Sequence, residues 1–324
     1  MTKKTKPNIK LGFSNGISII TAVFLFVVLL KNSSLAAVAV SGALKLCANV
    51  LIPSLFPLMI SAEIMTESTA IEKITHAFSV PISKLLGISK DATPPYFLAL
   101  FGGYTSSCKS AVLLYKNGTI SKNDCESLIA LSNIPSLAFM TGFIGIGIFK
   151  SSTIGWILWA ITVISTLILG TVNRLFFKSK ELFYKADVSI SKASKKLSKI
   201  VIDAISHSSY AMLTICACVV FFSVTIAILK LYFIKIPVSE YVKNLTLGML
   251  ELTQGITVFA DLEDFYLRIL SCAFLVGWSG LCIHFQVISL CEDVSISFKK
   301  YFIFKGLQAI ICTALAWLIF TFKF

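Results

Sequence analysis

Five ionisable side chains lie inside or beside long apolar stretches of this sequence, where a charge is costly and marks a candidate functional residue: Lys45, Glu63, Lys109, Glu251 and His284. Lys109 follows Gly102 by seven residues, and His284 follows Gly277 by the same interval. Both side chains can present positive charge to an anion, and a histidine can also move a proton near neutral pH. We therefore expect Lys109 and His284 to share a binding site for a small anion. Two plainer interpretations stay open: Lys109 extends to the membrane interface, or His284 is a hydrogen-bonded core residue.

Short runs of glycine, hydroxyl and amide residues interrupt the apolar stretches at residues 102–107, 132–136, 253–255 and 277–280. Backbone can leave helical geometry at membrane depth only where it is buried in protein or lines a wet cavity. The N-terminus of a half-helix also carries unpaired N–H groups and partial positive charge, which favour an anion or a carboxylate. We expect six polar side chains near these interruptions to complete the site: Thr105, Ser106, Ser107, Asn133, Gln254 and Gln286.

The composition predicts that hydrophobic helices hold these residues. The chain has 324 residues, of which 56% are hydrophobic and 14% are charged, and its mean hydropathy is +0.86. Soluble domains contain about a quarter charged residues, so we predict a polytopic membrane protein and exclude a soluble enzyme with a small anchor. The formal net charge of +13 is best explained by loop cations that fix orientation and contact anionic lipid. We expect no nucleic acid partner.

The cysteines and histidines give no pattern typical of a metal site. The nine cysteines lie mostly inside apolar runs and include no Cys-x-x-Cys pair, which is typical of small packing residues rather than disulfides or metal ligands. The three histidines are far apart and form no His-Glu-x-x-His helix. No nucleophile–base pair stands out either, so we expect no metal, no cofactor and no enzymatic activity.

Apolar stretches of spanning length, about 20 residues, divide the chain into four parts. Residues 1–34 comprise a lysine-rich cytoplasmic tail and a first transmembrane helix. Residues 35–177 and 209–324 form two halves of similar style, each with a broken apolar helix. Such interrupted segments at corresponding places in two halves indicate a transporter binding site. Chance similarity is the alternative explanation for the weak residue alignment between them.

Residues 178–208 are predicted to be a basic amphipathic linker on the cytoplasmic membrane surface. Four lysines recur there at helical spacing on one face: Lys192, Lys195, Lys196 and Lys199. We expect this face to contact anionic lipid. A solvated charged linker is the alternative.

Local signals add detail to the first half. Ser121 and Asp124 have the spacing of a capping box, which predicts a short helix that ends at Leu131. Pro53 and Pro57 lie inside an apolar stretch, where prolines kink or break a helix.

Several motifs resemble those of one known family: Gly103-Tyr104 with Lys109, Leu114 to Ser121, Ser132-Asn133, Gly145 to Phe149, Glu251 to Gly255 and His284 to Val287. From about residue 35 onward the chain resembles the YlbJ-type (SpoVV) sporulation integral membrane proteins. These share the gate, or nucleoside-recognition, domain of nucleoside transporters and spore maturation proteins. With the residue patterns, the resemblance predicts an all-α polytopic membrane protein, a two-fold repeated helical bundle with broken, re-entrant helices like the gate of a nucleoside transporter.

The resemblance also implies a function. A family member would be made during sporulation and carry dipicolinic acid toward the developing spore across the outer forespore membrane. Dipicolinate is a small planar dianion, which suits two half-helix N-termini together with Lys109 and His284.

The chain departs from the family pattern at several positions of these motifs. Thr105 stands in place of a proline, Ser107 of a glycine, Cys108 of an alanine and Gln254 of an asparagine. A relative with a changed substrate is therefore one alternative. A nucleoside or nucleobase carrier is a second, and a non-transporting scaffold that recruits sporulation partners is a third. The sequence is also compatible with assembly into a homo-oligomer.

Overall fold

The computed structural model describes residues 19, 23–24, 26–67, 69–177, 197–233 and 236–323. Within these ranges every regular element is a helix, and no strand occurs. Five helical stretches of the described chain are long and apolar enough to cross a membrane: Ser33–Ser61, Ser152–Phe176, Leu197–Phe233, Phe265–Leu290 and Lys299–Phe322. This confirms the predicted all-α polytopic class. The N-terminal lysines and residues 178–196, with Lys192, Lys195 and Lys196, lie outside the described part.

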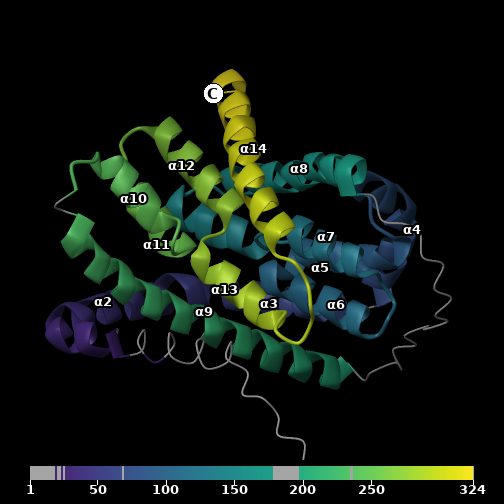
Figure 1. Ribbon diagram of the computed structural model, residues 1–324, viewed down its shortest axis with the longest axis horizontal. Helices are drawn as coiled ribbons and strands as arrows, with labels where there is room; N and C mark the ends of the chain where they lie inside the picture. The colour runs from purple at the N-terminus through teal and green to yellow at the C-terminus, as the bar shows by residue number, and fades with distance from the viewer. Residues whose placement is uncertain are drawn as a thin grey trace, which may run out of the picture.

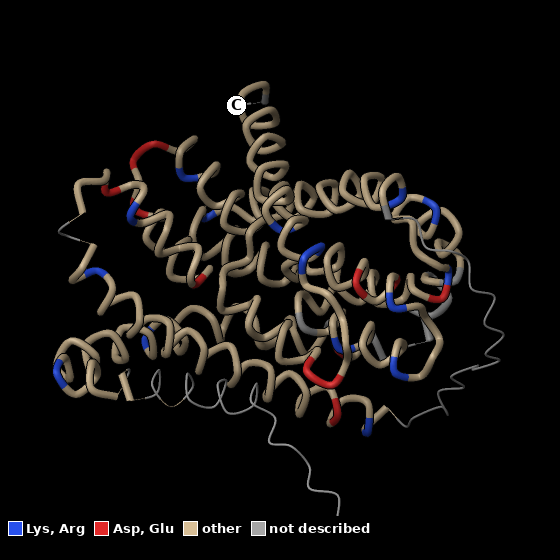
Figure 2. Tube along the Cα trace, viewed as in Figure 1, with Lys and Arg blue, Asp and Glu red and all other residues tan. Residues whose placement is uncertain are grey.

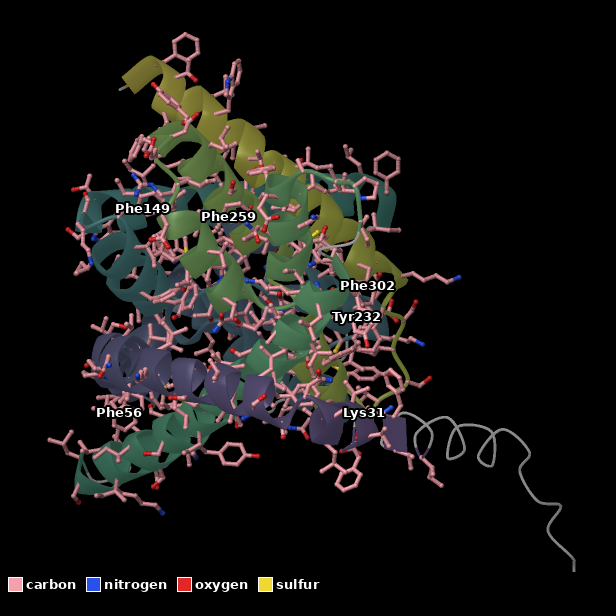
Figure 3. All side chains as sticks on the ribbon, turned by 90° about the vertical axis from the view of Figure 1, so that its left-hand side faces the viewer. Lys31, Phe56, Phe149, Tyr232, Phe259 and Phe302 are labelled. Carbon is pink, nitrogen blue, oxygen red and sulfur yellow. The ribbon has the colours of Figure 1, made fainter. Side chains whose placement is uncertain are left out.

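The first described helices run along one face of the molecule. α2 (Ser33–Leu46), a π-helical turn η1 (Cys47–Leu51) and α3 (Ile52–Glu67) follow one another directly. α9 (Leu197–Phe233) lies alongside α2 (Figures 1 and 3). The path does not break at Pro53 and Pro57. Because Pro53 has no N–H to donate, the wider hydrogen bonding of the preceding π turn accommodates it within the helical path.

Shorter helices fill the rest of the first half: α4 (Thr69–Leu86), a 3-10 turn η2 (Lys90–Ala92), α5 (Thr93–Gly102), α6 (Tyr104–Lys116), α7 (Lys122–Leu131) and a π-helical stretch η3 (Phe139–Ile148), followed by the long α8 (Ser152–Phe177). The capping prediction is confirmed, because the Ser121 Oγ accepts a hydrogen bond from the Asp124 N–H at 3.0 Å. Sequence reasoning missed both π-helical segments, η1 and η3.

The second half comprises α9 and five further helices: α10 (Glu240–Gly248), α11 (Leu252–Ala260), α12 (Phe265–Trp278), α13 (Leu281–Leu290) and α14 (Lys299–Lys323). Figure 1 shows α14 crossing the molecule and packing along α12 and α8. Its path brings it close to α7 as well. α14 therefore contacts both halves of the chain.

Three of the four predicted helix interruptions are confirmed. α5 and α6 are separated at Gly103, where φ is +74°. Residues 132–136 are non-helical, and α12 and α13 are separated at Ser279 and Gly280. The prediction for residues 253–255 was wrong, because these residues are in the first turns of α11. The break comes earlier, at Glu251, whose carboxylate accepts hydrogen bonds from the Thr253 and Gln254 N–H groups and so starts the helix.

The charged residues gather mostly at helix ends and connecting loops, while the long helices are largely uncharged (Figure 2). α9 continues without interruption from Leu197 to Phe233, so the predicted boundary between linker and span at residue 209 falls inside one helix. Apolar side chains such as Leu213 and Phe221 are exposed along this helix, as expected for a surface that faces lipid.

Candidate functional site

One face of α14 is polar and completely buried. Four side chains of this face recur at helical spacing, and each is at most 1% exposed: Tyr301, Lys305, Gln308 and Cys312. Residues spaced three or four apart lie on one side of a helix, so these four form a single stripe. Since α14 packs against α7, α8 and α12, the stripe faces the interior of the bundle. We call it the α14 polar stripe.

The Lys305 ammonium is bound only by neutral groups in the described chain. Its Nζ donates to the backbone carbonyl oxygen of Asn133 at 2.8 Å and to the side-chain Oε1 of Gln308 at 2.7 Å. The Gln308 amide in turn donates to the Ser165 Oγ at 3.2 Å. No carboxylate of the described residues forms an ion pair with Lys305. A buried cation without a counter-charge is costly, so this position would favour an anion.

Asn133 lies in the non-helical connector of residues 132–136, against the first turn of α6. The Ser107 and Ser132 hydroxyls share a hydrogen bond at one end of the contact. At the other end, a Cβ on Gly103 would lie 3.0 Å from the Ser136 nitrogen. The Asn133 side chain is buried, and neither its Nδ2 nor its Oδ1 has a hydrogen-bond partner within the described structure. The connector thus supplies the backbone carbonyl that binds Lys305, and the same residue carries a buried amide without a partner in the described structure.

His284 is fully buried next to the same stripe. Its Nδ1 shares a hydrogen bond of 2.6 Å with the Tyr301 hydroxyl, and its ring packs edge-on against Trp278, Tyr301 and Phe302. The Nε2 is buried and unpartnered among the described residues. Lys305 lies close enough to interact electrostatically with the ring. When Tyr301 donates to Nδ1, the imidazole proton is on Nε2 and can be donated to a ligand.

Tyr104 and Ser279 bring the two helix breaks together. Tyr104 begins α6, and its buried hydroxyl faces Ser279 but forms no hydrogen bond of good geometry in the described structure. The second break is held against α14, because a Cβ on Gly277 would lie 2.6 Å from the Ala309 Cα. Only a glycine allows this approach of α12 to the residue after Gln308.

The two half-helix N-termini differ in how their N–H groups are used. α6 starts without a side-chain cap. At the start of α13, the Leu281 N–H donates to the Met249 carbonyl at 2.9 Å and the Cys282 N–H to the Leu250 carbonyl at 3.0 Å. The expectation that both N-termini expose free N–H groups is therefore wrong for α13, because the chain between α10 and α11 supplies the acceptors.

The structure does not place the other predicted residues on the α14 polar stripe. Lys109 is exposed, and its Nζ lies 5.9 Å from the centre of the Tyr210 ring on α9. Gln286 is half-buried, and its amide contacts the Cys218 and Cys282 sulfurs. The Ser106 hydroxyl donates to the Gly102 carbonyl. The side chain of Thr105 lies outside the described part.

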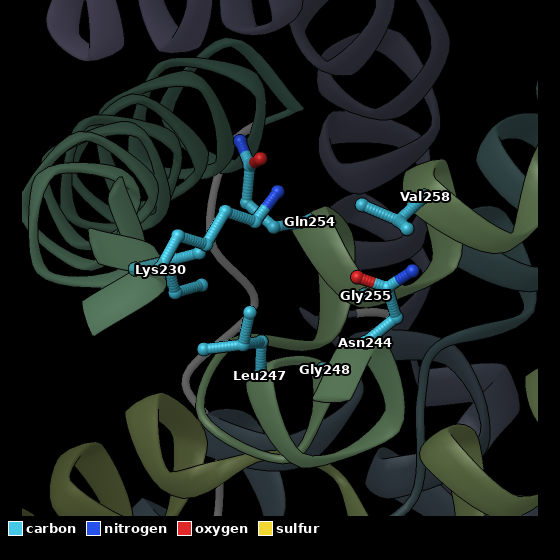
Figure 4. Close-up of a pocket in the computed structure, with 8 residues that line it drawn as sticks. Lys230, Asn244, Leu247, Gly248, Gln254, Gly255 and Val258 are labelled. Carbon is cyan, nitrogen blue, oxygen red and sulfur yellow. The ribbon is translucent and has the colours of Figure 1, made fainter. Parts of the chain in front are cut away.

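Gln254 lines a separate hollow between α9, α10 and α11 (Figure 4). Lys230 and Asn244 are its other polar side chains, and the backbones of Gly248 and Gly255 form part of the wall. The predicted set is thus divided. Asn133, Ser107 and His284 lie around the α14 polar stripe, whereas Lys109, Gln254 and Gln286 lie at other places.

Sequence reasoning missed Lys305, Gln308 and Tyr104. The signal for the first two was present, since Lys305 and Gln308 are three residues apart in an apolar stretch of spanning length. A lysine and an amide on one face of such a helix indicate an inward-facing polar pair. Tyr104 gave no comparable signal, because an aromatic residue beside a glycine is common in apolar helices.

A comparison with known proteins finds a similarity to a sporulation protein. Over 295 aligned residues, which cover 81% of this chain and 72% of the other, the sequence is 23% identical to the sporulation integral membrane protein YlbJ of Bacillus subtilis (strain 168). The chain is a distant homologue of that protein. The homology and the five candidate spans together establish a multi-pass integral membrane protein. No family model matches the present chain, and no solved structure matches it significantly.

Proposed function

We propose that this YlbJ homologue transports a small organic anion across the membrane, and that Lys305 supplies the positive charge that binds it. The observation that carries the proposal is the fully buried Lys305 ammonium, which has only neutral partners among the described residues. A carboxylate ligand would offset the cost of this charge. Charge-assisted hydrogen bonds to a carboxylate are also among the strongest that a protein forms.

Unused donors near the α14 polar stripe support a carboxylate rather than a simple halide. The Asn133 amide, the Tyr104 hydroxyl and the His284 Nε2 are buried without partners in the described structure. The connector of Asn133 and the helix of His284 both contact the α14 polar stripe, and Tyr104 faces Ser279 at the second break, which packs against α14. Several donors on different sides suit an anion with more than one oxygen. We therefore propose a carboxylate or dicarboxylate substrate, with dipicolinate, which the family resemblance implies, as the first candidate.

The paired helix breaks support movement of this anion by alternating access. α5 with α6, and α12 with α13, form two broken helices in the two halves of the chain. In secondary transporters, broken helices of repeated halves meet near the middle of the bilayer and hold the substrate. We propose that both pairs are re-entrant and that the outer forespore membrane is their location. The proposed path opens alternately on the two sides of the α14 polar stripe.

A nucleoside or nucleobase carrier is the alternative from the same class, since the family resemblance includes nucleoside transporters. A neutral substrate does not need a buried cation, so Lys305 favours the anion. A scaffold without transport activity needs neither the cation nor the unused donors.

Uptake into proteoliposomes tests the proposal. The purified protein would be reconstituted and offered dipicolinate, its monocarboxylate analogue picolinate, or uridine, each radiolabelled. We expect uptake of dipicolinate, competition by picolinate and no uptake of uridine. Uptake of uridine alone would instead support a nucleoside carrier. No uptake of any of them, with dipicolinate content also normal in spores that lack the protein, would contradict a transport function.

A further inference from the structure

Two buried cysteines from different halves of the chain meet beside the polar stripe. Cys108 is on α6, and Cys291 directly follows the last residue of α13. Their Sγ atoms are 3.6 Å apart, although the residues are separated by 183 positions in the sequence. Both side chains are 2% exposed. The sequence predicted that the cysteines are small packing residues rather than disulfide partners, but these two sulfurs lie in direct contact.

The surrounding contacts hold this pair in place. The Cys108 Sγ also lies 3.8 Å from the Val287 carbonyl oxygen on α13. Beyond the cysteines, the Lys116 Nζ at the end of α6 forms an ion pair of 2.8 Å with Asp293. α6 is therefore fastened to the end of α13 by contacts on both sides of the sulfurs. Little backbone movement is needed to bring the sulfurs from contact to bonding distance, about 2.05 Å.

We propose that Cys108 and Cys291 are a thiol modification site, at which a peroxide closes a disulfide between α6 and α13. The Cys291 thiolate attacks a peroxide oxygen and becomes a sulfenic acid as hydroxide leaves. The Cys108 thiol then attacks that sulfur, and water leaves as the S–S bond forms. The two thiols lose two electrons, and one hydrogen peroxide is reduced to two waters.

The two thiols are unequal in a way that suits this order of steps. Both cysteines lie outside the candidate membrane-spanning stretches. The hydrogen bond with Cys108 lowers the pKa of Cys291, whereas the hydrogen bond with Cys291, together with burial, raises the pKa of Cys108. The thiolate is the reactive form of a cysteine. The Cys108 thiol also has the Val287 carbonyl as an acceptor, so it can stay protonated while Cys291 ionises. In this order Cys291 is the nucleophile, and Cys108 is the resolving thiol.

The disulfide would also affect transport, a consequence that rests on the proposed function. Cys108 follows Ser107 in α6, which begins at the first break, and α13 begins at the second break. A covalent bond between α6 and the end of α13 would prevent the two broken helices from moving relative to each other. Oxidation would then stop transport without unfolding the protein.

Peptide mapping tests the bond directly. Membranes that contain the protein would be treated with hydrogen peroxide, blocked with N-ethylmaleimide and digested with trypsin without reductant. We expect a disulfide that links the peptide of residues 91–109 to that of residues 269–299. This link should be absent in the Cys108→Ser and Cys291→Ser variants. It should remain in Cys125→Ser, the matched control, because the Cys125 thiol lies buried nearby but donates to the Ala111 carbonyl.

Absence of the linked peptide in the oxidised wild type would overturn the proposal, as would its persistence in Cys291→Ser. Uptake of dipicolinate by proteoliposomes that contain the purified protein is a separate readout. It should fall at least tenfold on oxidation, recover with dithiothreitol, and stay unchanged in Cys108→Ser. A linked protein that still transports would leave the modification site standing and contradict only its effect on movement.

Discussion

The two helix breaks look alike in the sequence, but they differ in how their polar groups are used. At the first break, α6 begins at Tyr104 without a side-chain cap, and the Tyr104 hydroxyl and the nearby Asn133 amide have no partners in the described chain. At the second break, the N–H groups of Leu281 and Cys282 donate to carbonyls between α10 and α11. The Trp278 Nε1 donates to one of the same carbonyls, that of Met249, at 3.1 Å.

This difference separates a binding region from a supporting region. Polar groups left unpaired in a protein interior cost free energy, so their concentration at the first break indicates a place for a ligand. At the second break the backbone N–H groups are satisfied by the protein's own carbonyls. This break positions Ser279 and His284 beside the α14 polar stripe, and the His284 Nε2 has no partner in the described chain. Changes to the unpaired polar groups should therefore alter transport, whereas changes to the hydrogen bonds that support the second break should alter stability.

The largest effect is expected from Lys305→Met. Methionine keeps the length of the stem and removes the charge, so substrate binding is lost while the helix stays packed. Removing one partner of a buried charge pair costs about 2–5 kcal/mol, and we expect dipicolinate uptake to fall by roughly thirtyfold or more. Uptake would be measured at equal amounts of protein in the proteoliposomes.

Lys109→Met is the matched control, because it makes the same chemical change at an exposed lysine. We expect uptake close to that of the wild type. If the Lys109 variant lost transport and the Lys305 variant kept it, the assignment of the binding cation to Lys305 would be wrong. The binding cation would then be Lys109, as its position seven residues after Gly102 predicts.

Asn133→Leu is expected to have the next largest effect. Leucine has the same number of side-chain heavy atoms with the same branching, and the Asn133 amide forms no hydrogen bond in the described structure, so the fold should lose no interaction. A lost hydrogen bond to a charged ligand is worth about 1.5–3 kcal/mol, which predicts a loss of roughly tenfold or more in affinity. A thermal unfolding midpoint at or above that of the wild type, with weaker substrate binding, is the expected combination. Unchanged binding would remove Asn133 from the site.

The sequence predicted the class of fold and most of the helix interruptions, because glycine, serine and proline act on the local backbone. Gly103 and Gly280, for example, have positive φ values that other residues adopt with strain. The sequence did not predict which polar residues meet. Lys109 and His284 have matched positions along the chain, but the rotation of each helix is set by packing against distant segments. The spacing of Lys305 and Gln308 gave a signal for a polar helix face, but only the packing of α14 against the connector of residues 132–136 shows which groups this face meets.

In the segment that supports the second break, Glu251→Ala should reduce stability more than transport. Its carboxylate accepts the Thr253 and Gln254 N–H groups at 3.0 and 2.6 Å, and the loss of such a cap costs about 1 kcal/mol. We expect a thermal unfolding midpoint a few degrees lower, and uptake per folded protein within about twofold of the wild type. A loss of transport without a change in the midpoint would move Glu251 into the transport site.

Trp278→Phe should have the smallest effect. Phenylalanine retains the aromatic contact with His284 and removes only the hydrogen bond from Nε1 to the Met249 carbonyl. A single hydrogen bond contributes about 0.5–1.5 kcal/mol, so we expect a slightly lower unfolding midpoint and normal uptake. A strong transport defect in this variant would show that the hydrogen bond to the Met249 carbonyl also positions the substrate site.

Equilibrium binding of dipicolinate to the purified protein tests the central claim, that Lys305 is the charge that holds the anion. Isothermal titration calorimetry would compare the wild type, Lys305→Met and Lys109→Met, all folded in the same detergent. The account predicts that binding is lost in the Lys305 variant and retained, within a factor of about two, in the Lys109 variant. Binding of wild-type strength to the Lys305 variant would contradict it.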